Sequence, residues 1–385
     1  MHILIVNLSP VEAITSAMIR TLAIARGMAE DGHQVDMVAM PYANAGTKGK
    51  TPEFMSEINV IRIGGNKIYE NLVKSSGNNG VINRLKHFGL NAARKVWHSL
   101  AIYDLSIKNA KQMDIDILPR KEYDVIISSS DPKSSHIAVK SLISQGLKYD
   151  RWIQYWGDPL ATDINMKSIY PKSVLIKKES NIINGADKIV YVSPFTLNVQ
   201  KKLFPKYSDI MSFLPIAYMD CRNYDKNENA RFTVDYYGSY YTRDRNILPF
   251  YQACKTLGSE IEAHIVGDSD LVLEETENIS IIPRGIIDEL EEKTDLIVCI
   301  LNNRGTQIPG KIYHAAGTNK KILVVLDGEN IDAMREYLES FNRFLICENS
   351  EESIMQAILQ AQKCDINYFP CEELSYKRIS KRLVE

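Results

Sequence analysis

The sequence lacks the features that would place it among membrane-spanning, secreted or nucleic-acid-binding proteins. Its 385 residues carry a formal net charge of -2, so the overall charge does not favour nucleic acid as a partner, and any basic patch must be local. No apolar run approaches the roughly 18 residues that span a bilayer. No charged segment precedes an apolar run at the N-terminus, as it would in a signal peptide. These absences predict a globular protein of the cytoplasm.

Cysteine pairs and the common motifs of metal, nucleotide and nucleophile sites are missing as well. The six cysteines form no CxxC, which favours a reducing compartment. We find no HExxH, no Cys/His cluster, no GxGxxG after the first apolar run, no Walker-type GxxxxGKS/T and no GxSxG. Two DxD pairs, Asp114 with Asp116 and Asp268 with Asp270, have no convincing nucleotide context. The sequence therefore predicts neither a metal nor a cofactor.

What is present is an alternation of short apolar runs and helical patterns, which occurs twice along the chain. Hydrophobic residues make up 45% and charged residues 24%, as in a globular protein long enough for two domains. The apolar runs at 1–8 and 34–40 flank a helical pattern at 14–29, which makes a βαβ unit. Ser193 and Pro194 suit the N-cap and first residue of another helix. Further strands are predicted at 59–63, 123–130, 151–156 and 187–193.

The alternation restarts after the charged, turn-rich segment MDCRNYDKNENAR, residues 219–231. We therefore predict an α/β protein of two Rossmann-like, doubly wound domains, 1–212 and 213–365, with ligands in the cleft between them. Residues 366–385 are ambiguous and could form a helix that packs back on the first domain. In the second domain the predicted strands are 231–239, 261–268, 279–283, 295–301 and 321–328, and the predicted helices are 246–258, 286–293, 308–317 and 352–364.

The segment IPGKIYHAAGTNKKILVV, residues 308–325, is one candidate site. Gly310 permits a ligand to approach the backbone, Lys311 adds a charge in the first helical turn, and His314 follows one turn later. Backbone amides at a helix start favour phosphate. On local chemistry alone, an ordinary helix with a solvated lysine is the favoured interpretation.

The segment YYGSYYTRDRN, residues 236–246, is a second candidate. A predicted strand ends at Gly238 and Ser239, and Arg243 and Arg245 follow just before a helix. A glycine turn with basic side chains suits a nucleotide diphosphate. A solvent-exposed loop explains the same residues equally well.

Two further segments are candidates for the acceptor and for a membrane. In IQYWGDPL, residues 153–160, Asp158 follows an apolar strand, where a carboxylate can orient or deprotonate an acceptor hydroxyl or simply cap a turn. Residues 81–100 combine apolar residues at helical spacing with basic ones and no acidic one, which suits an interfacial helix on an anionic membrane. A core-packed helix with a solvated basic face is slightly favoured over that alternative. The membrane candidates are Arg84, Lys86, Arg94, Lys95 and Trp97.

The order of these elements resembles that of the group 1 GT-B glycosyltransferases of bacterial polysaccharide and lipopolysaccharide assembly. The resemblance covers nearly the whole chain, although each motif is loose. It is carried by LAIARGMAEDGHQVDMVAM, YDVIISSSDPKSSHIA, WIQYWGDPL, ADKIVYVSPFTLNVQ, VDYYGSYYTRDRNILPFYQAC, HIVGD and IPGKIYHAAGTNKKILVV, in that order.

The resemblance implies a fold, a reaction and roles for particular residues. Such enzymes hold a nucleotide sugar in the second domain and the acceptor in the first, usually retain anomeric configuration and need no metal. Carried over by position, Gly238, Arg245 and Lys311 would hold the diphosphate of a UDP or GDP sugar, His314 its ribose or sugar, and Asp158 the acceptor side. The acceptor would be a saccharide or a lipid-linked saccharide, handled in the cytoplasm with possible peripheral contact at the inner membrane.

The chain departs from this family at two positions. Relatives usually carry a glutamate three residues after the lysine and another eight residues before that glutamate, whereas this chain has His314 and Thr306. Two alternatives stay open, the first because the same fold supports it and the second mainly because the acidic pair is missing. One is a nucleotide-sugar 2-epimerase of the same fold, and the other is a non-catalytic GT-B-like subunit that binds a partner or a membrane.

Overall fold

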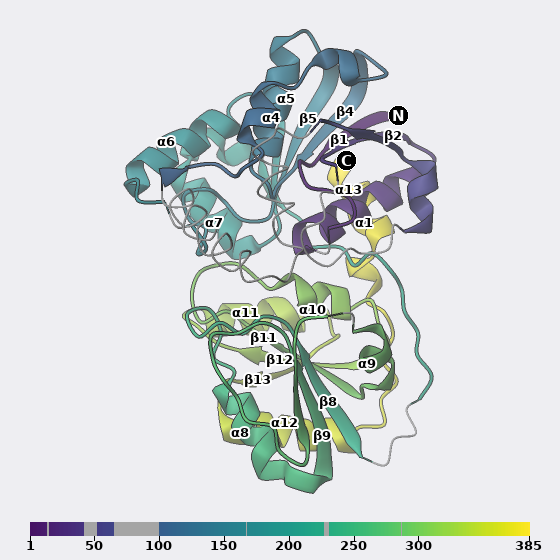
Figure 1. The fold of residues 1–385 in the computed structure, drawn as a ribbon, viewed down its shortest axis with the longest axis vertical. Coiled ribbons are helices and arrows are strands. Elements are labelled where there is room, and N and C mark those ends of the chain that lie inside the picture. Colours follow the sequence, from purple (N-terminus) through teal and green to yellow (C-terminus); the bar gives the residue numbers. More distant parts are fainter. Residues whose placement is uncertain (14, 42–51, 65–99, 167, 227–230, 286) are drawn as a thin grey trace, which may run out of the picture. The chain divides into compact units, whose positions relative to one another are not determined.

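The computed structural model divides the chain into two compact units (Figure 1). The first comprises Met1–Pro215 and Tyr376–Glu385, and the second comprises Ile216–Ser375. Each unit is built on its own parallel sheet. The structure describes residues 1–13, 15–41, 52–64, 100–166, 168–226, 231–285 and 287–385.

The first unit contains a seven-stranded sheet of order β3-β2-β1-β4-β5-β6-β7, in which all pairs are parallel. Its strands are apolar because both faces of the sheet are covered, as the fully buried Ile3, Leu4 and Ile5 of β1 show. The strands are β1 His2–Val6, β2 Gln34–Ala39, β3 Asn59–Arg62, β4 Glu122–Ser129, β5 Lys148–Trp156, β6 Lys188–Tyr191 and β7 Met211–Phe213.

The helices of the first unit follow its strands in the alternating order expected of a doubly wound fold. In α7 the side chain of Ser193 accepts a hydrogen bond from the N–H of Thr196 and Pro194 is the first residue, as predicted. The helices are α1 Ser16–Glu30, α4 Ile107–Lys111, α5 Ser134–Ser144, α6 Lys172–Ile183, α7 Pro194–Leu203 and α13 Tyr376–Val384, with short 3-10 turns at Glu53–Glu57, Ile115–Ile117 and Pro205–Ile210.

The second unit contains a six-stranded parallel sheet of order β10-β9-β8-β11-β12-β13. The predicted doubly wound α/β architecture is therefore confirmed. The strands are β8 Phe232–Tyr237, β9 Ile261–Val266, β10 Ile279–Ile282, β11 Leu296–Ile300, β12 Lys321–Leu326 and β13 Leu345–Glu348. The helices are α8 Leu248–Leu257, α9 Asp288–Lys293, α10 Gly310–Ala315, α11 Ile331–Glu339 and α12 Glu351–Lys363, with 3-10 turns at Gly258–Glu260 and Glu372–Leu374.

The last helix, α13, packs against α1 of the first unit (Figure 1, yellow against purple). The hydroxyl of Tyr376 donates to Glu30 Oε2 at 2.8 Å, and Lys377 forms an ion pair with the same carboxylate at 3.2 Å. Gly27 permits the close approach of the two helices, because a Cβ there would lie 2.1 Å from Ser380 Oγ. The chain thus leaves the first unit after Pro215 and returns to it at Tyr376.

Candidate functional site

In the second unit, the strand order reverses between β8 and β11, so the loops after these two strands meet at the carboxyl edge of the sheet. The N–H of Asn303 donates to the carbonyl of Asp244 at 2.9 Å, and Arg304 Nη2 lies 3.0 Å from Asp244 Oδ1. These contacts join the loop after β11 to the loop after β8. Open α/β sheets bind ligands at such a switch point, so the two joined loops are the first place to look for a site.

Gly238, directly after β8, brings the backbone against Lys311 on α10. A Cβ at Gly238 would lie 3.2 Å from Lys311 Nζ. The turn is also tightly packed against the loop after β9, since a Cβ at Gly267 would lie only 1.9 Å from the Gly238 carbonyl oxygen. The glycines therefore let the backbone of two loops and the Lys311 side chain lie together.

Arg245 and Lys311 place two cations at this edge of the sheet. Arg245 Nη1 donates to the carbonyl of Ser239 at 2.7 Å, while its Nε is buried without a hydrogen-bond partner in the described part of the chain. The Lys311 residue keeps exposed surface, but the outer part of its side chain lies against the backbone of Gly238. Partial burial of its ammonium group, together with the charges of Arg245 and Arg284, lowers the pKa of Lys311 to about 8.

Within the described ranges, no carboxylate is paired with these two cations. Across the residues that the structure describes, neither Lys311 nor Arg245 forms an ion pair with an Asp or Glu side chain. Cations that repel one another without an anionic partner are unfavourable in an empty site and favourable when an anion binds. The arrangement can therefore hold an anion with more than one charge, such as a diphosphate.

The remaining predicted donor residues lie near this edge in different environments. Arg243 is half-exposed, and its Nε lies 2.9 Å from Asp244 Oδ2, a carboxylate that it shares with Arg304. Gly310 is the first residue of α10, and His314 lies in its last turn, partly buried. The helix predicted over 308–317 spans only Gly310–Ala315, and so short a helix has a small dipole. The charge at this site comes mainly from side chains.

In the first unit, the strand order reverses between β1 and β4. After β1, Asn7 Nδ2 donates to Thr21 Oγ1 at 3.0 Å. Arg20 on α1 is only 4% exposed, and its Nη2 donates to the carbonyl of Ser130, which follows β4. The N–H of Gly157, after β5, donates to Ser130 Oγ at 3.1 Å. Loops from three strands and helix α1 thus meet at one edge, the usual ligand edge of such a sheet.

The loop after β5 carries Asp158, and hydrogen bonds anchor this loop on both sides. The N–H of Ala161 donates to Glu179 Oε2 at 2.6 Å, and Lys133 Nζ donates to Asp163 Oδ2 at 2.9 Å. Glu179 is fully buried on α6, and burial raises the pKa of its carboxyl to about 7. The position of the loop that carries Asp158 therefore depends on the side chains of Glu179 and Lys133.

Asp158 is half-buried among groups of both charges. Burial and the neighbouring carboxylates of Asp131 and Asp163 raise its pKa to about 7, while Lys133 and Arg20 act in the opposite direction. Lys133 is held between Asp131 and Asp163, at 2.9 Å from each. A carboxyl that titrates near neutral pH can both accept and release a proton, which suits a general acid or base.

Sequence reasoning did not select Arg20, Lys133 or Glu179. Lys133 stands three residues after the predicted strand 123–130, and a position so close to the carboxyl end of a strand could have marked it as a candidate. Arg20 and Glu179 lie inside helices, at 4% and 0% exposure. Nothing in their sequence context separates them from solvated helix residues, because their burial arises from tertiary packing.

The two DxD pairs have local structural roles in the structure. Asp114 accepts a hydrogen bond from the N–H of Asp116 at 2.9 Å, and Asp270 accepts one from the hydroxyl of Thr242 at 2.8 Å. Within the described ranges, no group of three His, Cys, Asp or Glu side chains could hold a metal ion.

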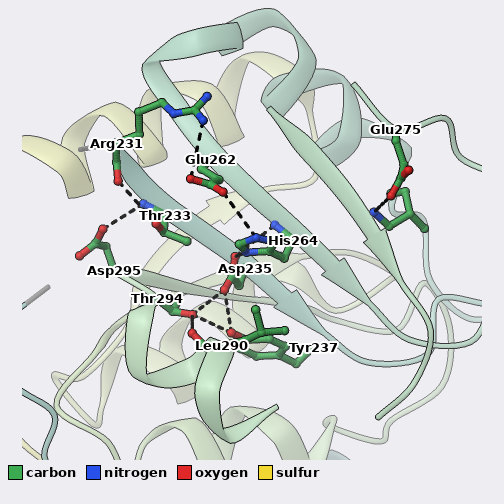
Figure 2. Close-up of polar contacts among 11 residues, drawn as sticks. Arg231, Thr233, Asp235, Tyr237, Glu262, His264, Glu275, Leu290, Thr294 and Asp295 are labelled. Atoms are coloured by element: carbon green, nitrogen blue, oxygen red, sulfur yellow. Dashed lines mark hydrogen bonds and ion pairs between the residues drawn. The ribbon is translucent and has the colours of Figure 1, made fainter. Parts of the chain in front are cut away.

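A separate polar cluster lies within the second sheet, between β8, β9 and the residue after α9 (Figure 2). Asp235 is fully buried and lies 2.8 Å from His264 Nδ1. The hydroxyls of Tyr237 and Thr294 donate to the same carboxylate at 2.7 and 2.5 Å. The hydrogen bond to Asp235 raises the pKa of His264. Because the carboxylate is fully supplied with donors from the protein, we assign this cluster to the stability of the fold.

Residues 81–99 of the predicted basic helix lie outside the described residues. The side chains proposed to contact a membrane therefore stay a prediction from the sequence. These are Arg84, Lys86, Arg94, Lys95 and Trp97. Among the described helices, none has the length and apolar character needed to cross a membrane.

Solved structures with a similar fold include glycosyltransferases and a trehalose 6-phosphate synthase. HepE of Anabaena in complex with UDP-glucose matches with a TM-score of 0.55 and 12% identity, over 100% of this chain and 96% of that chain. The chain has the GT-B fold. A glycosyltransferase of Rickettsia africae matches with a TM-score of 0.52 and 15% identity, over 99% and 92% of the two chains. The α,α-trehalose 6-phosphate synthase of Burkholderia multivorans matches with a TM-score of 0.53 and 9% identity, over 100% and 94%.

Comparison with models of known protein families gives no match, and comparison with curated protein sequences gives none either. The GT-B fold predicted from the order of sequence elements is confirmed by the structural matches, which span both units. At such low identities the likeness concerns the fold, so the activity has to be argued from the residues.

Proposed function

We propose that the protein is a glycosyltransferase that moves a sugar from a nucleotide diphosphate sugar to a saccharide or lipid-linked saccharide acceptor. The observation that carries the proposal is the pair of cations, Lys311 and Arg245, beside the Gly238 turn at the switch point of the second sheet. A diphosphate supplies the negative charge that the described protein groups do not. HepE, which shares the fold, has been crystallised with UDP and glucose and with UDP-glucose.

The proposed chemistry follows from the charges at the two sites. Sugar transfer breaks the bond between the anomeric carbon and the diphosphate oxygen, and negative charge develops on the departing nucleotide diphosphate. Lys311 and Arg245 would stabilise that charge, and loss of one such preorganised partner typically costs about 10²–10³ in kcat. Asp158, with a pKa raised to about 7, would orient the acceptor hydroxyl and take up its proton.

The proposal includes the finer points implied by the family resemblance. His314 would hydrogen-bond hydroxyls of the ribose or sugar, the reaction would retain anomeric configuration, and no metal would take part. The setting would be the cytoplasmic assembly of a bacterial surface polysaccharide, with UDP or GDP sugars as donors.

Nucleotide binding tests the donor site directly. Titration calorimetry with UDP and GDP should show binding to the wild-type protein and at least about tenfold weaker binding to Lys311→Met, since a hydrogen bond to a charged group contributes about 1.5–3 kcal/mol. Lys255, an exposed lysine on α8, provides the matched control Lys255→Met, which should bind as the wild type does. Equal binding by wild type and Lys311→Met would remove the basis of this assignment.

The absence of acidic side chains at positions 306 and 314 favours the second candidate, a non-catalytic GT-B-like subunit. Incubation of UDP-glucose and GDP-mannose with the protein distinguishes the transferase, the epimerase and the non-catalytic subunit. A transferase consumes the donor only with an acceptor present, an epimerase converts the donor alone, and a non-catalytic subunit leaves it intact.

A further inference from the structure

Gln307 lies in the loop between β11 and α10, four residues before Lys311. Its side-chain Nε2 and Oε1 are both buried, and neither has a hydrogen-bond partner in the described part of the chain. No other described Gln or Asn side chain has both amide atoms in this condition. Its own carbonyl oxygen is engaged, since Asn302 Nδ2 donates to it at 3.3 Å. The backbone of Gln307 is therefore anchored, while its side chain makes no polar contact with the residues that the structure describes.

An amide in this condition is costly for the folded protein. A carboxamide offers two donors and two acceptor positions, and leaving a buried donor or acceptor unsatisfied carries its full desolvation penalty. A residue kept only for the stability of the loop would be paired or apolar. Because the side chain forms no hydrogen bonds, turning it toward a ligand breaks none.

The loop of Gln307 belongs to the same edge of the sheet as the cation pair. Asn303, four residues earlier, donates to the carbonyl of Asp244 in the loop that carries Arg245. The four-residue separation from Lys311 spans at most about 14 Å of extended chain. Gln307 thus lies within the length of one nucleotide sugar whose diphosphate is held by Lys311.

We propose that Gln307 binds a vicinal pair of hydroxyl groups of the nucleotide-sugar donor, on its ribose or on its sugar. This inference rests on the proposed function. Neighbouring hydroxyls each donate and accept, so they satisfy both ends of the carboxamide at once. A phosphate would pair with Nε2 and leave Oε1 facing negative charge. The loop sequence LNNRGTQIP, residues 301–309, contains no carboxylate, so amides and a hydroxyl are the acceptors it offers to a sugar.

The test replaces the amide by an apolar side chain of similar shape. Gln307→Met should leave the Tm of the unliganded protein unchanged or raise it, and should weaken donor binding about tenfold, the loss of one to two neutral hydrogen bonds. The exposed Gln252 on α8 supplies the control Gln252→Met, which should change neither property. A lower Tm with unchanged donor affinity would show a structural role and overturn the inference.

Ligand variants identify which hydroxyls are bound. The titrations use UDP, GDP, their 2′-deoxy forms, UDP-glucose and GDP-mannose. If Gln307 contacts the ribose, Gln307→Met binds UDP and GDP more weakly than the wild type does, but binds the 2′-deoxy forms equally well. If it contacts the sugar, the affinity of Gln307→Met is reduced only for the nucleotide sugars. An equal loss of affinity for the ribo and 2′-deoxy nucleotides would indicate a contact with the base or the phosphates and would overturn the diol assignment. If the wild type binds none of these ligands the proposed function itself fails, whereas wild-type binding that Gln307→Met retains in full defeats this inference alone.

Discussion

Glu179 offers a test of the first unit that does not depend on the proposed activity. The residue is fully buried on α6, and burial raises the pKa of its carboxyl to about 7 from the ordinary value of 4.5. A carboxyl with a raised pKa binds its proton more tightly in the folded than in the unfolded protein. Its protonation therefore stabilises the fold below pH 4.5, and that stabilisation is lost as pH rises through about 7.

The size of the effect follows from the two pKa values. Integrating the difference in bound protons from pH 5 to pH 8 gives a loss of about 2–3 kcal/mol in the free energy of unfolding. Glu179→Gln does not titrate, yet its side-chain oxygen can still accept the hydrogen bond from the N–H of Ala161. We expect the stability of the variant relative to the wild type to rise by about 2–3 kcal/mol between pH 5 and pH 8.

Tryptophan fluorescence during urea unfolding measures this unit selectively. All three tryptophans, Trp97, Trp152 and Trp156, belong to residues 1–215, and the latter two are fully buried. Glu57→Gln, at an exposed glutamate of the same unit, controls for the loss of a charge. The reasoning fails if the stability difference between wild type and Glu179→Gln is the same at pH 5 and pH 8.

Three further predictions concern the second unit. Because the pKa of Lys311 is lowered to about 8, calorimetric UDP binding should weaken by at most about tenfold per pH unit above pH 8, and Lys311→Arg should abolish that dependence. Gly267→Ala would place a Cβ 1.9 Å from the Gly238 carbonyl oxygen, so it should lower the free energy of unfolding by about 1–3 kcal/mol. Gly285→Ala is the control, because its Cβ would have no neighbour nearer than 3.8 Å, and it should leave thermal unfolding nearly unchanged. The raised pKa of His264 means that its charged form stabilises the fold below pH 6.5 and that this contribution is lost as pH rises through the folded-state pKa. His264→Gln should therefore show a smaller stability deficit at high pH than at low pH by circular dichroism, and a constant deficit would contradict this.

Local signals in the sequence predict the framework of the fold well. Buried parallel strands are continuous apolar runs, so β1 and β11 are evident from the sequence, and the Ser193 cap with Pro194 marks the start of α7. Helix α6 was not predicted, and the buried Glu179 interrupts its apolar face. In such a helix, tertiary packing overrides the pattern on which sequence reasoning depends.

The candidate sites could be predicted only in part. The sequence places Gly238 and Arg245 in one segment and Lys311 in another, and the family resemblance is what suggested that the three act together. Their contacts follow from the order of strands in the sheet, which a single sequence does not reveal. The unpaired state of Gln307 has no sequence signature, because it depends on which groups surround the amide in the folded chain.

The return of the chain to its first unit has a consequence for biosynthesis. During translation, the contacts that α13 makes with Gly27 and Glu30 of α1 cannot form until residues 376–385 have been made, after the whole of the second unit. The second unit, in contrast, is one continuous segment and can fold as soon as it emerges. The first unit, although most of it is synthesised first, therefore gains its last helix only after the second unit has been made.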